Sequence, residues 1–251
     1  MIYSLRKSVG AGSAWSQTIG LLLALCCTGC VATGPIGSST QPNVIVMRGP
    51  GGYFPHLAEF EDRLIEEGAC PTVAFPEAQG TIAERIIGGR NRGRLTGPII
   101  IVGYSFGANA ALSLSERLGE RGIEVDKLVL VEASDSKRVP DNVRACFNIY
   151  KSQPWTEYVP VLAGRPIQAA SPATELVNYD VREYNDGRFD WDNHLTLAAN
   201  PHVQDLMIDE VRAAIEPDEP VLPNTDIPIE GDSDDGGAGR ASVMKDVPTV
   251  D

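Results

Sequence analysis

A serine between two glycines is the feature of this sequence that points most directly to chemistry. Gly103-Tyr-Ser-Phe-Gly107 lies between a β-branched run, Pro98–Val102, and a stretch of strong helix formers, Ala108–Leu118. Glycines at both ends of the motif allow a sharp, strained turn that exposes the serine hydroxyl beside a helix N-terminus. The pattern alone is weak, but between a strand and a helix it predicts that Ser105 is a nucleophile. The alternative is a glycine-rich turn with an idle serine.

A serine hydroxyl needs a base that takes its proton, and the chain has three histidines. His194 lies beyond the last predicted strand and before the last predicted helix, downstream of Ser105, and is the predicted base. His202 lies in the first turn of the final helix and is expected to be solvated. His56 follows the first glycine cluster and precedes the serine, so it fits no triad order and could at most line a pocket.

The elements that must position these groups follow from the apolar pattern. Short β-rich runs alternate with amphipathic stretches, which predicts a mostly parallel central sheet with helices on both faces. The expected strands are Asn43–Met47, Pro71–Phe75, Pro98–Val102, Lys127–Val131, Arg144–Tyr150 and, more weakly, Val177–Tyr184. The expected helices are one from Leu57 that Gly68 ends, then Thr81–Ile87, Ala108–Leu118 and Pro201–Ile215, the last capped by Asn200. A glycine- and arginine-rich loop is expected from Ile87 to Gly97.

Four motifs resemble the α/β-hydrolase superfamily, in its small lipase and thioesterase-like forms. They are Met47-Arg-Gly-Pro-Gly-Gly52, Gly103-Tyr-Ser-Phe-Gly107, Leu128-Val-Leu-Val-Glu132 and Asn193-His-Leu-Thr196. The resemblance covers one domain, residues 43–215. It implies a mostly parallel sheet with a minimal cap, triad order serine–acid–histidine, and cleavage of a carboxylic ester or thioester through an acyl-enzyme on Ser105.

The triad acid has two main candidates. Many members of the superfamily carry it after the second strand beyond the serine, but here Tyr150-Lys-Ser-Gln-Pro154 offers no carboxylate. Thioesterase-like members carry it after the first strand, which gives Glu132, with Asp135 three residues on. Position favours Glu132, whereas aspartate is the commoner acid type. The remaining candidates precede His194 and are rather expected in a solvated loop: Asp180, Asp186, Asp190 and Asp192.

The resemblance also implies an oxyanion hole of two backbone N–H groups. One belongs to Phe106, directly after the nucleophile, and the other to the loop Arg48–Gly51, for which Gly49 is the named donor. Arg48-Gly49 stands where many relatives have His-Gly, which leaves the donating amide open. Arg48 could contact an acidic substrate group or be a charge on a loop. Residues 152–173 could form a small cap or a surface loop, with apolar side chains for an acyl pocket at Trp155, Tyr158, Val159, Val161 and Leu162.

The N-terminal residues 1–29 have the order of a secretory signal: Arg6 and Lys7, an apolar run from Ile19 to Cys27, then small residues. The run is shorter than the roughly 20 residues that span a bilayer. Cys27-Thr-Gly-Cys30 resembles a bacterial lipoprotein signal, in which Cys30 is lipidated, although Cys27 stands where leucine is usual. Residues 30–42 would be a flexible tether. We expect an exported, lipid-anchored envelope protein; an ordinary cleaved signal would give a periplasmic or secreted one.

The C-terminal residues 216–251 are rich in Pro, Gly and Asp and have no apolar period. They hold ten acidic and two basic residues, and so most of the chain's net charge of −13. Such a segment buries too little apolar surface to offset its ordering entropy, so we expect a disordered tail. Nothing in the chain resembles the basic footprint of a nucleic-acid binder.

Cysteine usage and metal-ligand spacing give no further chemistry. Once the signal is removed and Cys30 is lipidated, Cys70 and Cys146 remain, and a single pair is no disulfide framework, so buried thiols are expected. On the implied strand order, several strands would separate the two. No His/Cys cluster has ligand spacing, so no metal or cofactor is expected.

Two other interpretations stay open. Tyr104 and the short chain favour a cutinase-like esterase, although no disulfide framework is visible. The acidic tail and tether would suit a non-catalytic envelope protein with an α/β-hydrolase fold. Retention of Ser105, His194 and both glycine elements argues against that, because a binding or scaffold protein needs none of them. Acyl length, leaving group and oligomeric state stay open.

Overall fold

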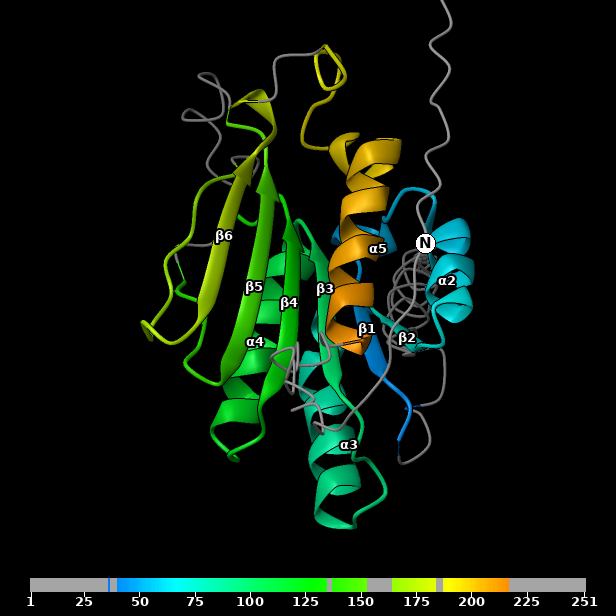
Figure 1. The fold of residues 1–251 in the computed structure, drawn as a ribbon, viewed down its shortest axis with the longest axis vertical. Helices are drawn as coiled ribbons and strands as arrows, with labels where there is room; N and C mark the ends of the chain where they lie inside the picture. The colour runs from blue at the N-terminus through cyan, green and yellow to red at the C-terminus, as the bar shows by residue number, and fades with distance from the viewer. Residues whose placement is uncertain (1–35, 37–39, 135–136, 153–163, 184–186, 217–251) are drawn as a thin grey trace, which may run out of the picture. The chain divides into compact units, whose positions relative to one another are not determined.

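Six parallel strands form the centre of the fold (Figure 1). Their order across the sheet is β2-β1-β3-β4-β5-β6, and all five neighbouring pairs are parallel. The carboxyl ends of the strands therefore meet at one edge of the sheet. The strands are β1 (Asn43–Met47), β2 (Cys70–Ala74), β3 (Ile99–Tyr104), β4 (Val125–Val131), β5 (Val143–Tyr150) and β6 (Glu175–Asp180).

The computed structural model describes residues 36, 40–134, 137–152, 164–183 and 187–216, which all belong to one compact unit. Several predictions lie outside the described residues. They concern the signal with Cys30, most of the tether, the acids Asp135 and Asp186, the tail beyond residue 216, and the side chains proposed for an acyl pocket, Trp155, Tyr158, Val159, Val161 and Leu162.

Helices cover both faces of the sheet. Helices α2 (Leu57–Glu66) and α5 (Pro201–Ile215) pack on one face, and α3 (Gln79–Asn91) and α4 (Phe106–Gly119) on the other. In Figure 1, α5 lies in front of the strands and α4 behind them. Short 3-10 helices are η1 (Pro50–Gly52), η2 (Pro76–Ala78), η5 (Val181–Glu183) and η6 (Leu197–Ala199). The fold class predicted from the sequence is confirmed.

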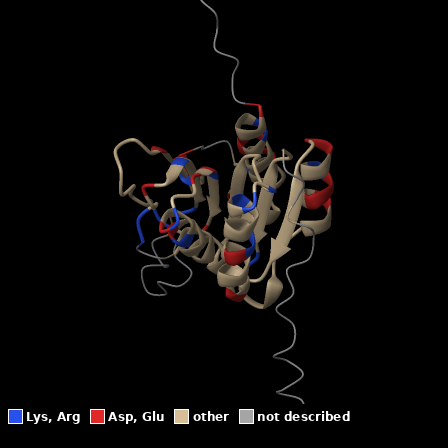
Figure 2. Ribbon diagram, turned by 90° about the horizontal axis from the view of Figure 1, so that it is seen from below, with Lys and Arg blue, Asp and Glu red and all other residues tan. Residues whose placement is uncertain are grey.

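The two faces of the sheet carry separate apolar cores because successive residues of a strand point to opposite sides. In β3, Ile99 and Ile101 join the core under α3 and α4, whereas Ile100 and Val102 join the core under α2 and α5. The strands are mostly free of charged residues in Figure 2, and Lys, Arg, Asp and Glu gather on the helices and loops. Within the described ranges, no helix is both long enough and apolar enough to cross a membrane.

Two predicted boundaries are wrong by about four residues, and the others lie within about two residues of the observed ones. Helix α3 continues to Asn91, where a loop was expected from Ile87. Its apolar face stays buried through Gly89, whose missing side chain leaves room for Leu95. The last strand ends at Asp180, before the expected Tyr184, because the Asp180 carboxylate accepts the N–H of Arg182 and starts a turn.

Cys70 and Cys146 lie far apart, as expected. Three strands separate β2, which carries Cys70, from β5, which carries Cys146. At about 4.8 Å per strand this is roughly 19 Å, far beyond the reach of a disulfide. Cys146 is buried, but Cys70 is only half-buried, which corrects the expectation for that thiol.

Candidate active site

Three neighbouring strands end in polar residues at the same edge of the sheet. Ser105 follows β3, Glu132 follows β4 and Lys151 follows β5. Because the strands are parallel, these positions lie side by side. His194 reaches them from the connection between β6 and α5.

The turn at Ser105 has the strained geometry that its glycines permit. Ser105 has φ 57° and ψ −121°, a conformation that non-glycine residues rarely adopt. A Cβ at Gly103 would lie 2.6 Å from the Cα of Ala108, and one at Gly107 would lie 2.0 Å from the carbonyl oxygen of Met47. Both glycines are therefore required for the close approach of β3, α4 and the end of β1.

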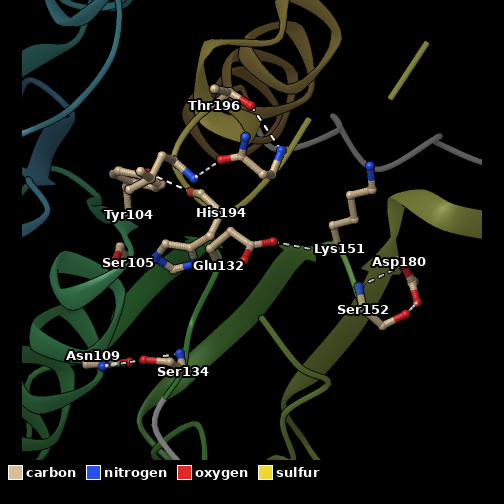
Figure 3. A network of polar contacts seen from close by, with 12 residues as sticks. Tyr104, Ser105, Asn109, Glu132, Ser134, Lys151, Ser152, Asp180, His194 and Thr196 are labelled. Carbon is tan, nitrogen blue, oxygen red and sulfur yellow. Dashed lines mark hydrogen bonds and ion pairs between the residues drawn. The ribbon is translucent and has the colours of Figure 1, made fainter. Parts of the chain in front are cut away.

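Ser105, His194 and Glu132 form a hydrogen-bonded series (Figure 3). Ser105 Oγ lies 2.8 Å from His194 Nε2, and His194 Nδ1 lies 2.9 Å from Glu132 Oε2. Each of the three residues is at most 4% exposed. An ionised carboxylate only accepts, so Nδ1 carries the proton and Nε2 accepts the serine hydroxyl. This arrangement can remove a proton from Ser105.

Both oxygens of Glu132 have partners. Oε2 accepts from His194, and Oε1 accepts the backbone N–H of Lys151 at 2.7 Å. Glu132 itself has φ 58°, and its own N–H donates to the carbonyl of Ile149. A Cβ at Gly164 would lie 2.6 Å from Oε2, so the backbone of Gly164 packs directly on the carboxylate.

The other described acids of the sequence prediction are placed elsewhere. Asp180 accepts from Ser152 Oγ at 2.5 Å, and Asp192 accepts from Thr196 and Asn200. Asp190 is exposed. Among the described carboxylates, the structure therefore brings Glu132 to His194.

Two tyrosines hold the backbone around His194, and the sequence analysis assigned them no such role. The Tyr104 hydroxyl donates to the carbonyl of His194 at 2.7 Å, and the Tyr53 hydroxyl donates to the carbonyl of Leu195 at 3.1 Å. Burial raises the pKa of Tyr104, so its phenol keeps the proton that it donates. The sequence held one signal for this role of Tyr104, which is its position inside the serine motif.

The other two histidines lie away from the serine. His56 directly precedes α2 and is exposed, with Nδ1 4.0 Å from Glu59 Oε1. His202 lies exposed in the first turn of α5, where its ring faces that of Phe189. Among the described histidines, His194 is the hydrogen-bond partner of Ser105.

The two predicted oxyanion donors, Phe106 and Gly49, differ in whether their backbone N–H groups are already hydrogen-bonded. Phe106 is the first residue of α4, where backbone N–H groups have no partner within the helix. The structure contradicts Gly49, whose N–H donates to the carbonyl of Tyr53 at 2.8 Å because the η1 turn folds the chain back. Arg48 N–H donates to Ala74, and Pro50 has no N–H. The Gly49 N–H is therefore already used by a hydrogen bond within the loop and is not available to a substrate oxyanion.

The Arg48 side chain is half-buried and stacks on an aromatic ring. Its Cζ lies 4.0 Å from the centroid of Phe75. A Cβ at Gly52 would lie 3.4 Å from the same Cζ. Arg48 was expected either to contact an acidic substrate group or to be a charge on a loop. The contacts with Phe75 and Gly52 fit the second interpretation. Within the described residues, no group of three or more His, Cys, Asp or Glu side chains is arranged to hold a metal ion.

No family model matches the chain, and neither does any curated protein. Similar solved structures include a cutinase-like protein from Cryptococcus sp., at 15% identity over 73% of this chain and 98% of that chain, with a TM-score of 0.43. Est1E from Butyrivibrio proteoclasticus is 13% identical over 70% and 87%, with a TM-score of 0.42. The type II thioesterase BorB from the borrelidin biosynthetic cluster is 14% identical over 72% and 95%, with a TM-score of 0.42.

Proposed function

We propose that the protein is a serine hydrolase that cleaves a carboxylic ester or thioester through an acyl-enzyme on Ser105. The observation that carries this proposal is the buried series of hydrogen bonds from Ser105 through His194 to Glu132. Its members come from three separate segments, and each is positioned by strained backbone or by side-chain contacts. Such a series has no use in packing alone, since an apolar residue at each position would be easier to bury.

The proposed reaction proceeds in two halves. Ser105 Oγ attacks the substrate carbonyl carbon while His194 Nε2 takes its proton, and Glu132 stabilises the resulting imidazolium. The oxyanion accepts the N–H of Phe106 at the positive end of α4. His194 then protonates the departing alkoxide or thiolate. In the second half His194 activates a water molecule, which releases the acid and restores Ser105.

The principal rival is a non-catalytic envelope protein with the same fold. The backbone conformation of Ser105 argues against this rival interpretation. A non-glycine residue at φ 57° and ψ −121° costs on the order of 1–3 kcal/mol, and glycine would remove that cost. A binding or scaffold protein has no reason to retain serine there. A cutinase-like esterase stays within the proposed reaction class and differs in substrate.

A fluorophosphonate probe tests the proposal directly. We expect it to label the intact protein and to lose the label in Ser105→Ala. Ser113→Ala is the matched control, because Ser113 lies on α4, the helix that follows Ser105, but donates to the carbonyl of Asn109. Turnover of p-nitrophenyl butyrate should follow the labelling. Absence of labelling in the folded wild-type protein would refute the proposal.

A further inference from the structure

We propose that Lys151 is a positioning residue that holds the acid and the base of the triad in register. The inference rests on the proposed function, since it concerns the same three side chains. Lys151 is the first residue after β5, and it lies beyond Glu132 in the series of Figure 3. Its backbone contacts the acid, and its side chain contacts the segment that carries the base.

The backbone contact fixes the carboxylate. Lys151 N–H donates to Glu132 Oε1 at 2.7 Å, which turns the other oxygen, Oε2, towards His194. This N–H is placed by the end of β5, and the pairing of β5 with β4 places Glu132 beside it. The contact survives any substitution at position 151 except proline.

The side-chain contact fixes the segment that leads into His194. Lys151 Nζ donates to the carbonyl of Phe189 at 2.6 Å, to that of Asp192 at 2.8 Å and, more weakly, to that of Asp190 at 3.3 Å. An ammonium has three N–H donors, so this one turn uses all of them. Hydrogen bonds from a charged donor are roughly twice as strong as neutral ones. Asp192 is two residues from His194, so movement of this turn displaces the imidazole.

The choice of partners separates this lysine from an ordinary surface charge. Among the described residues, Nζ contacts backbone carbonyls and no carboxylate. Phe189 is only 4% exposed, which anchors the same turn in the apolar core. Lys151 therefore connects the end of β5 to the backbone carbonyl groups of a turn. The position of this turn decides where His194 lies.

Removing the ammonium while keeping the backbone tests this role. Lys151→Met keeps the N–H to Glu132 and the length of the side chain. We expect kcat for p-nitrophenyl butyrate and the fluorophosphonate labelling rate to fall about tenfold, because small displacements of catalytic groups reduce rates steeply. KM should change less than about twofold. Lys151→Arg, which keeps charge and donors, should restore part of kcat.

A spectroscopic readout addresses positioning without turnover. The proton between His194 Nδ1 and Glu132 should give a far-downfield proton NMR signal. In Lys151→Met this signal should broaden or vanish while the core methyl signals stay unchanged. Lys137→Met is the matched control, because Lys137 is an exposed lysine that contacts Ser113 and Glu116, and all readouts should match wild type.

The outcomes divide cleanly. An unchanged kcat and NMR signal in Lys151→Met overturns the inference, and so does an equal loss in Lys137→Met. A loss explained wholly by the unfolded fraction, with normal kcat per folded molecule, overturns it as well. If the Met variant does not fold, Lys151→Gln takes its place and must show kcat below that of Lys151→Arg. A wild-type protein that the probe does not label refutes the proposed function instead.

Discussion

At the scale of single residues, Gly164 offers a test of whether the Glu132 carboxylate must keep its position. A Cβ at this position would meet Glu132 Oε2 at 2.6 Å and Oε1 at 2.7 Å. The carboxylate is the end of a flexible side chain, so it can swing away, but this move breaks its hydrogen bonds in a buried site. It would then leave His194 and the N–H of Lys151. We expect Gly164→Ala to lower kcat at least tenfold and to lower the free energy of unfolding by roughly 1–3 kcal/mol, because buried polar groups lose their partners. Ester turnover and urea denaturation measure the two.

Gly80→Ala is the control for this prediction. Gly80 lies inside α3, and no atom lies within 4 Å of the position of its Cβ. Alanine should leave kcat unchanged and stabilise the protein by up to about 1 kcal/mol, because it favours the helix. If Gly164→Ala keeps the wild-type kcat, the observed position of the Glu132 carboxylate is not required for turnover.

The residues of the site were predictable to different degrees. Ser105 and His194 could be named because glycine spacing and chain order restrict them. Glu132 was separable from other acids only by its place after a strand, and its φ of 58° has no signature in the sequence. Lys151 and Gly164 were not found, because their roles depend on contacts across 19 and 32 positions of the chain. Gly49 was wrong because a turn of three residues decides where one amide points.

At the scale of elements, the apolar periodicity of the sequence was sufficient to predict the type and the order of the helices and strands. β3 is β-branched and buried on both faces, and α5 begins at Asn200, whose side chain accepts the N–H of His202 as the cap prediction requires. The end of α3 was missed because two glycines and an arginine resemble a loop. Burial of its apolar face outweighs the weak helix propensity of glycine, about 1 kcal/mol per residue.

An ion pair between two helices gives a pH-dependent stability. Arg212 of α5 binds both carboxylate oxygens of Glu67, the residue after α2, at 2.8 and 2.6 Å. This hydrogen bonding lowers the pKa of Glu67 from its ordinary 4.5. A lowered folded pKa means that the stabilisation is complete above 4.5 and is lost as the pH falls through the folded value. The pair lies at the surface, so we expect its contribution to stability to be small.

Glu67→Gln tests this tie between α2 and α5. Urea denaturation should show a small loss of stability at pH 7 that shrinks as the pH falls below 4.5. Glu66→Gln, on the exposed side of the same helix end, is the control and should be neutral at pH 7. A loss that is as large at pH 3 as at pH 7 would contradict the electrostatic origin.

At the scale of the whole fold, the site exists because the sheet is parallel. Three strands deliver the proposed nucleophile, the proposed acid and Lys151 to one edge, and the connection to α5 brings His194 to them. The same arrangement exposes large apolar side chains there. Among the described residues, four such side chains flank the site in sequence or contact: Tyr53, Phe106, Trp191 and Leu195. An acyl chain that packs on these side chains would remove apolar surface from water.

We therefore expect the proposed hydrolase to prefer apolar acyl chains. Leu195 directly follows the base and is 56% exposed, and Phe106 directly follows the nucleophile and is 43% exposed. Each buried methylene contributes up to about 0.8 kcal/mol, so kcat/KM should rise roughly twofold per added methylene from acetyl to octanoyl p-nitrophenyl esters. Leu195→Ser should flatten this dependence while leaving acetate turnover within about twofold, since its backbone contacts persist. Ile65→Ser removes an equally exposed side chain, 57%, from α2 and should leave the dependence intact. A wild-type rate that does not rise with chain length, or an equal effect of the two serine variants, would mean that these side chains face solvent without a partner in catalysis.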